Sequence, residues 1–275
     1  MNNIKSKFSE RGVILLIIGI IIFRFLYGLT NEFWFKDEDV IQIYLIGLKS
    51  FTTGSYPYFG ADLVYTHSQI PGALQGYLVS LGWYLWEIPE APMIVLNVIL
   101  DLSLLFLVWY ISKRLPQLPL WIIICSVFLV PWSICYFTRV INPSYVIPGA
   151  IVFFIGIFEI YPFLRAGVLS RRLAYFFLGF GLFWIFQLHM SWVLLCPYIL
   201  IAFYYLIRSN KPKEIIGNSL SFLVGCMITG SLLLPTLMQY GLGNPNGTSV
   251  ASVVTFHIEH LGIILKLLAS FLAYG

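Results

Sequence analysis

Charge is scarce in this sequence. Only 10% of its 275 residues are Asp, Glu, Lys or Arg, 59% are apolar, and the mean hydropathy is +0.88. Soluble globular proteins contain about 25% charged and roughly 45–50% apolar residues. The composition therefore excludes a soluble domain, a disordered chain and a nucleic-acid-binding protein, and it favours an integral membrane protein.

Motifs for nucleotide and zinc binding are also missing. No GxGxxG follows an expected strand, and neither HExxH nor a paired Cys/His spacing occurs. The four cysteines lie in apolar runs without CxxC spacing, so we expect buried, reduced side chains rather than disulfides. The N-terminal apolar run, 12–29, is too long for a signal peptide and lacks a small-residue cleavage site.

Long apolar runs fill most of the chain. A membrane span needs about 20 such residues. The run 173–207 would extend about 52 Å as one helix, so we predict two spans with a hairpin near Leu188–Trp192. The runs cover 12–30, 70–88, 91–111, 118–137, 144–162, 173–207, 215–239 and 261–275.

The basic residues decide the topology, because Lys and Arg concentrate in cytoplasmic loops. If the run 70–88 lies on the outer surface instead of spanning, eleven of the 16 basic residues become cytoplasmic. This gives a cytoplasmic N-terminus, seven complete spans, a partial eighth in 261–275, and a long first outer loop over 31–90. We also expect the chain to be incomplete at its C-terminus. The eleven are Lys5, Lys7, Arg11, Lys113, Arg114, Arg165, Arg171, Arg172, Arg208, Lys211 and Lys213.

Acids and histidines gather on the predicted outer face. Three adjacent carboxylates, Asp37-Glu38-Asp39, follow the first span, and their repulsion favours a raised pKa of the kind that suits a general base. An amphipathic stretch, 40–51, comes next, so a helix-start cap without chemistry explains the acids equally well. The other outer members are Glu32, Asp62, Glu87, Glu90, Glu259, His67, His189, His257 and His260.

A family resemblance rests on the order of these features. An Asp-Glu pair opens one juxtamembrane helix, TTGSYPYFG follows, and HSQIPGALQGYL opens a second such helix. This order resembles the GT-C membrane glycosyltransferases, and it is similar to bacterial relatives of protein O-mannosyltransferases and of the lipid A aminoarabinose transferase. The resemblance covers most of residues 10–210. The second Pro of the family's His-Pro-Pro-Leu motif is absent here.

The resemblance implies an all-α polytopic bundle with a catalytic site on the outer face of a bacterial inner membrane. The donor would be a polyprenyl-phosphate sugar, and the acceptor a glycan, lipid or protein hydroxyl. Asp37 would be the base, with Glu38 orienting the acceptor or binding a divalent metal ion together with His67 or His189. Arg139, in TRVINPSYVIP, would stabilise the donor phosphate. Asn142 stands where relatives have an acid, and QLHMSW supplies Gln187 and His189, so His67, Asn142, Gln187 and His189 are candidate substrate-binding residues.

Two other classes of function stay open. A transporter or lipid flippase would carry ionisable residues at the membrane midplane, where the sequence offers Asp101. An inactive accessory subunit fits the missing second acid. Arg24 and Asp101 both fall within predicted spans at similar depth, so we predict a structural ion pair, with Asn97 one helical turn away.

Overall fold

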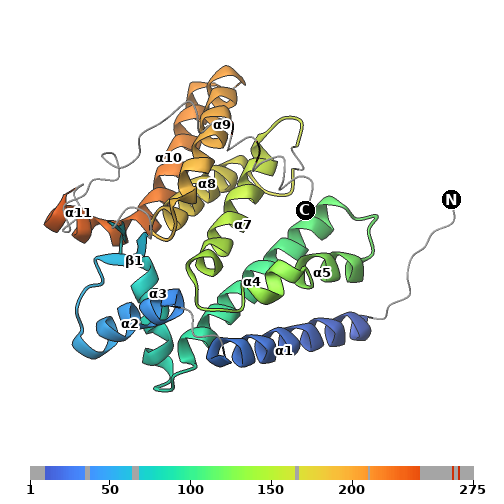
Figure 1. The fold of residues 1–275 in the computed structure, drawn as a ribbon. Coiled ribbons are helices and arrows are strands. Elements are labelled where there is room, and N and C mark those ends of the chain that lie inside the picture. The colour runs from blue at the N-terminus through green and yellow to red at the C-terminus, as the bar shows by residue number, and fades with distance from the viewer. Residues whose placement is uncertain are drawn as a thin grey trace.

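The computed structural model describes residues 10–34, 38–63, 68–164, 167–209 and 211–241, together with the single residues 262 and 266. Helices dominate this part of the chain, and a two-stranded sheet interrupts them (Figure 1). The predicted all-α class is therefore confirmed. The run 261–275 falls almost wholly outside the described residues. In chain order the elements are α1 (Glu10–Trp34), α2 (Glu38–Thr53), β1 (Phe59–Leu63), β2 (Ser68–Pro71), α3 (Leu74–Leu85), α4 (Ala91–Arg114), α5 (Leu120–Phe128), α6 (Pro131–Cys135), α7 (Asn142–Ile160), α8 (Arg171–Phe186), η1 (Met190–Leu195), α9 (Cys196–Ser209), α10 (Pro212–Gly230), η2 (Ser231–Leu233) and α11 (Leu234–Tyr240).

Five helical segments in the described residues are long and apolar enough to cross a membrane. Such segments are compatible with an integral membrane protein, but the predicted count of seven complete spans is not confirmed. Runs 118–137 and 173–187 account for the difference, because their helices are shorter than expected. The five segments are Arg11–Asn31, Ala91–Arg114, Asn142–Ile160, Met190–Arg208 and Pro212–Tyr240.

A break divides the run 118–137. The helix α5 ends at Phe128, and α6 starts at Pro131 after Val130, which has extended backbone angles (φ −62°, ψ 130°). Proline disfavours the α conformation in the residue before it, and it cannot supply a helical N–H. The run therefore forms two short helices where one span was predicted.

The run 173–207 does reverse direction, as the predicted hairpin requires. The helix α8 ends at Phe186, and the Tyr175 hydroxyl near its start donates to the Ala202 carbonyl of α9 at 2.8 Å. The two helices are therefore antiparallel, with the turn at the predicted position. Because α8 has only 16 residues, it extends about 24 Å, less than the hydrocarbon thickness of about 30 Å.

Glycines set the spacing of α8 against its two neighbours. A Cβ on Gly179 would lie 2.0 Å from the Phe222 carbonyl oxygen of α10, and one on Gly181 would lie 2.6 Å from the Gly149 carbonyl oxygen of α7. Close backbone approach at small residues is typical of helix packing in membranes. The Gly179-Phe180-Gly181 sequence thus contacts two helices on opposite faces of α8.

We expect Gly179→Ala to destabilise the protein by about 2–3 kcal/mol, because a backbone carbonyl cannot move aside as a side chain can. Thermal unfolding in detergent would measure the effect. Gly19→Ala is the matched control, since a Cβ there meets nothing within 4 Å, and it should leave stability unchanged or slightly raised. Equal melting temperatures for the two variants would contradict this account of the α8–α10 contact.

The first loop contains more structure than two helices. β1 and β2 pair antiparallel, with Asp62 opposite Gln69. The predicted 70–88 helix is wrong at its beginning, because Ile70 and Pro71 belong to β2 and Gly72 has φ 118°. Helix α3 begins only at Leu74. Its 12 residues extend about 18 Å, which is too short to cross a membrane.

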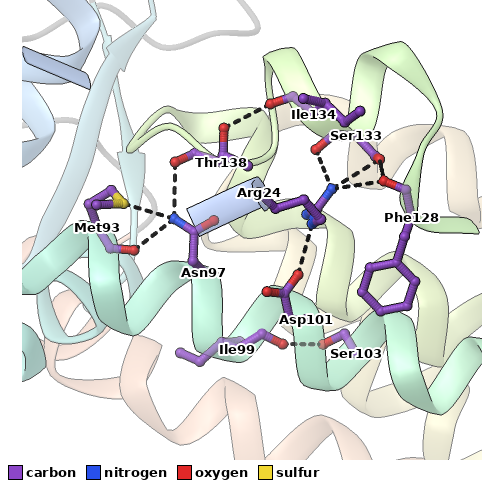
Figure 2. Close-up of polar contacts among 10 residues, drawn as sticks. All are labelled: Arg24, Met93, Asn97, Ile99, Asp101, Ser103, Phe128, Ser133, Ile134 and Thr138. Atoms are coloured by element: carbon purple, nitrogen blue, oxygen red, sulfur yellow. Dashed lines mark hydrogen bonds and ion pairs between the residues drawn. The ribbon is translucent and has the colours of Figure 1, made fainter. Parts of the chain in front are cut away.

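Arg24 and Asp101 form the predicted ion pair (Figure 2). The guanidinium Nε lies 2.9 Å from Asp101 Oδ1, and Arg24 is fully buried. The same guanidinium donates through Nη1 to the Phe128 carbonyl at 3.2 Å and to the Ser133 carbonyl at 2.8 Å. Arg24 thus also donates to backbone oxygens at the break between α5 and α6, where the helical hydrogen-bond pattern is interrupted in an apolar interior.

Acidic and basic residues are distributed unequally between the two ends of the bundle. We call the end that carries α2 and α3 the first-loop end, and the end where α8 and α10 begin the basic end. Glu38, Asp39 and Asp62 belong to the first-loop end. The cytoplasmic position of the basic end stays a prediction. Described basic residues of the basic end are Lys113, Arg114, Arg171, Arg172, Arg208, Lys211 and Lys213.

Candidate functional site

The two helices of the first loop pack on each other. A Cβ on Gly47 of α2 would lie 2.4 Å from Val79 Cγ1 of α3, and Tyr44 meets Trp83 edge to face at 5.8 Å. The opposite face of α2 leaves three apolar side chains exposed at helical spacing, namely Ile41, Leu45 and Leu48. An exposed apolar stripe of this kind suits a helix lying in a membrane interface.

Two of the predicted site residues, Asp37 and His67, lie outside the described residues, so their positions are not assigned. Glu38 and Asp39 occupy the first turn of α2 and are exposed, where the helix dipole favours negative charge. One turn further on, Gln42 Oε1 accepts a hydrogen bond from the Asp62 backbone N–H at 3.3 Å. The β1 strand and its acid are therefore tied to the helix that carries Glu38.

A buried amide cluster surrounds the turn between β2 and α3. Gln75 is fully buried, its carbonyl accepts from the Ala61 N–H at 3.1 Å, and its amide donates to Asn142 Oδ1. On the other side of the turn, a Cβ on Gly72 would lie 2.6 Å from Gln187 Oε1, so only glycine fits. Two predicted residues, Asn142 and Gln187, are thus brought to the same turn of the first loop.

Gln187 has a structural role in addition to the predicted one. Its amide donates to the Thr229 carbonyl of α10 at 2.7 Å and to the Phe183 carbonyl at 3.2 Å. The side chain therefore joins the end of α8 to α10 and packs against Gly72. Its carbonyl oxygen Oε1 is buried and has no hydrogen-bond partner among the described residues.

Arg139 and His189 lie close in sequence to Asn142 and Gln187, respectively. Arg139 stands three residues before Asn142, and Thr138 beside it contacts Gly28 of α1, so this loop lies against the last turns of α1 that precede the acids. His189 stands two residues after Gln187 and is half-buried. Its Nδ1 accepts from the Ser191 N–H at 3.1 Å, so the neutral ring carries its proton on Nε2.

Among the described residues, no group of three His, Cys, Asp or Glu side chains could hold a metal ion. His189 offers only Nε2 as a ligand, because Nδ1 already accepts a hydrogen bond. Because His67 lies outside the described residues, the predicted metal site of Glu38 with His67 or His189 stays a prediction.

Burial lowers the pKa of His189 below its usual 6.5. The unfolded chain then binds this proton more readily than the folded chain, so stability is complete above about pH 6.5 and falls as the pH drops toward the folded pKa. We expect the melting temperature in detergent to decrease over this window. His189→Asn should remove part of the decrease, because its amide oxygen stands where Nδ1 does and accepts from Ser191 without titrating. An unchanged profile in this variant would contradict the assignment.

A cavity of about 380 Å³ opens beside the turn at the first-loop end. Its walls come from α2, the 55–59 loop, β2 and the end of α11, and they combine aromatic rings with polar side chains. Tyr58 and Phe59 both contact Tyr240, at centroid distances of 5.3 and 5.1 Å. Lys49 lines the cavity and has no carboxylate partner among the described residues. The cavity thus combines aromatic faces with one cation.

Hydrogen bonds hold this cavity in shape. The Tyr56 hydroxyl donates to the Leu232 carbonyl, and the Thr236 hydroxyl donates to the Tyr58 carbonyl at 2.8 Å. Burial raises the pKa of Tyr56 to about 12, so the phenol stays neutral and keeps its proton. The first loop is therefore fixed to the η2–α11 segment by the residues that line the cavity.

Several of these residues were not singled out by the sequence analysis, namely Lys49, Gln75, Thr229 and Tyr240. The signal for Gln75 was present, since HSQIPGALQGYL contains it. However, the sequence does not identify the hydrogen-bond partner of an amide in an apolar helix. Tyr240 is 182 residues from Tyr58, and a contact over that distance has no local pattern.

No protein-family model, no curated protein and no solved structure matches this chain.

Proposed function

We propose that the chain is a membrane glycosyltransferase that moves a sugar from a polyprenyl-phosphate donor to an acceptor hydroxyl on the outer face of the membrane. The observation that carries this proposal is the aromatic cavity with Lys49 at the same end of the bundle as Glu38, Asp39 and Asp62. Ligand pockets of about 300–1,000 Å³ that combine aromatic side chains with polar groups are typical of small-molecule sites. Aromatic faces suit the apolar side of a sugar ring, and a cation suits its phosphate.

The proposed reaction is a single displacement with inversion. Asp37 accepts the proton of the acceptor hydroxyl, whose oxygen attacks the anomeric carbon from the side opposite the phosphate. The bond between that carbon and the phosphate oxygen breaks, and the polyprenyl phosphate leaves with the bonding electrons. Arg139 stabilises the departing charge electrostatically, and Glu38 orients the acceptor. No nucleotide sugar is needed for this step.

The test uses the purified full chain in vesicles with synthetic polyprenyl-phosphate sugars and a panel of soluble and lipid acceptors. We expect release of polyprenyl phosphate that depends on an acceptor. Lys49→Gln should raise the KM for the donor about tenfold, by loss of one charged contact. Lys113→Gln removes a charge at the basic end and should leave the KM unchanged.

Three outcomes would contradict the proposal. Movement of the lipid across the vesicle membrane without release of polyprenyl phosphate would favour a flippase. The absence of both turnover and movement would favour an accessory subunit. An equal rise in KM for both lysine variants would show that the cavity does not receive the donor.

A further inference from the structure

A second cavity, of about 590 Å³, opens at the basic end, far along the bundle from the site described above. The N-terminal residues of α8 and α10 line it. We propose that this cavity binds a phosphate group, presented either by a lipid head group or by a soluble phosphate ester. The proposal is independent of the glycosyltransferase function, since it uses none of the same residues.

The beginnings of two parallel helices meet at this cavity. Gly217 near the start of α10 lies beside Arg172 near the start of α8, and Gly230 at the end of α10 contacts Phe183 near the end of α8. The helices therefore run in the same direction, and their positive dipole ends lie together. Such helix ends favour phosphate, because their first N–H groups have no partner within the helix.

Two guanidinium groups line the same space. Arg171 and Arg172 are the first residues of α8, and Ser170 caps that helix by accepting from the Leu173 N–H at 3.3 Å. The Arg172 guanidinium crosses toward α10, since a Cβ built on Gly217 would lie 3.5 Å from its Nε. Guanidinium groups hold phosphate oxygens through paired N–H donors.

Asn218 is the observation that points to a ligand. It is 4% exposed and lines the cavity, next to Gly217 and the Arg172 guanidinium. Its side-chain amide makes no hydrogen bond in the part of the chain that the structure describes. An amide N–H in a cavity wall that also contains two guanidinium groups is a donor for an anion.

One acidic residue in the cavity lining limits how much negative charge a bound ligand can carry. Glu214, one turn before Asn218, also lines the cavity. The lining thus has two positive charges and one negative charge, which suits a phosphate ester with one negative charge better than a highly charged anion. A purely apolar ligand would leave the Asn218 amide without a partner.

The two sources of phosphate are distinguished with the purified full chain. In nanodiscs of phosphatidylcholine with added phosphatidylglycerol, mass spectrometry of the intact complex reports retained anionic lipid. In detergent, titration with glycerol 3-phosphate and with inorganic phosphate, followed by thermal shift, reports a soluble ligand. Retained lipid that soluble phosphate does not displace identifies the head group, and saturable stabilisation by the soluble ester identifies the free compound.

The variants separate a built site from general positive charge. We expect the double variant Arg171→Gln/Arg172→Gln to lower affinity at least about tenfold, by loss of charged hydrogen bonds. Asn218→Asp keeps the shape of the side chain but puts a carboxylate in place of the amide, so it should lower affinity similarly. Lys213→Gln removes a charge from the first turn of α10 outside the cavity lining and should change affinity less than about twofold.

Three results would overturn the proposal. They are an absence of binding in both assays, an equal loss in Lys213→Gln and the arginine variant, and full binding by an Asn218→Asp protein. Melting temperatures without ligand show whether each variant is folded. If the double variant is not folded, Asn218→Asp and the single variant Arg172→Gln decide the question.

Discussion

Asp37→Asn is expected to lower glycosyl transfer about 10²–10⁴-fold, because loss of a general base typically costs that much. The substitution keeps the shape of the side chain and removes its proton acceptor. Asp37 precedes α2, whose first turn carries Glu38 and Asp39. Adjacent residues of a helix point about 100° apart, so Glu38 and Asp39 do not both face the same acceptor hydroxyl.

The measurement compares Asp37→Asn, Glu38→Gln and Asp39→Asn at matched amounts of folded protein in the membrane. Glu38→Gln is expected to have the smaller effect of an orienting residue, and Asp39→Asn little effect. Near-normal turnover in Asp37→Asn with loss in a neighbour would move the base to that neighbour. Full activity in all three variants would contradict the glycosyltransferase proposal itself.

Periodic and charged features made much of the fold predictable. The all-α class, the reversal between α8 and α9, the two helices of the first loop and the Arg24–Asp101 pair were all expected from apolar runs and residue depth. These features are local, or they follow from the cost of an isolated charge in an apolar interior. A single ionisable residue in each of two predicted helices leaves few choices of partner.

The errors have local causes that apolar composition hides. Pro131 divides one predicted span into α5 and α6, although the run around it is apolar throughout. Pro71 and Gly72 end a short strand where a helix start was expected. Hydropathy measures how well a segment tolerates lipid, whereas backbone breaks depend on single residues, so the number of spans was the least predictable quantity.

The candidate site was predictable in its loops and not in its contacts. Asn142 and Gln187 were selected by resemblance, and the structure brings both to the turn around Gly72. Their partner Gln75 and the aromatic wall around Tyr240 depend on contacts between distant segments. Such contacts follow from the packing of the whole bundle, and a sequence pattern contains no direct record of them.

Removal of one partner from the Arg24–Asp101 pair is expected to destabilise the protein by about 3–5 kcal/mol, because the other charge stays buried and uncompensated. Arg24→Met and Asp101→Leu are the two single variants. Unfolding in mixed micelles would measure each change. Ser103→Ala is the control on the same helix, since its hydroxyl bonds only to the Ile99 carbonyl at 2.7 Å, and it should cost less than about 1 kcal/mol.

The double variant tests whether the pair is structural. Arg24→Met/Asp101→Leu removes both charges, so it should be more stable than either single variant. Recovery should be incomplete, because the Ser133 carbonyl loses the Arg24 donor, whereas the Phe128 carbonyl keeps the Ser133 hydroxyl at 2.8 Å. One orphaned carbonyl costs about 1–3 kcal/mol. The loss of stability that remains in the double variant separates the role of Arg24 at the α5–α6 break from its role in the ion pair.

Asp101→Asn distinguishes a structural pair from a proton relay. The amide oxygen still accepts from Arg24 Nε but cannot take up a proton, so a structural pair predicts reduced stability with activity in proportion to the folded protein. Normal stability with abolished activity would assign Asp101 to proton transfer and would favour the transporter alternative. The structure supports the first result, because the Asp101 carboxylate is bound to a fully buried guanidinium whose Nη1 is held by two backbone carbonyls.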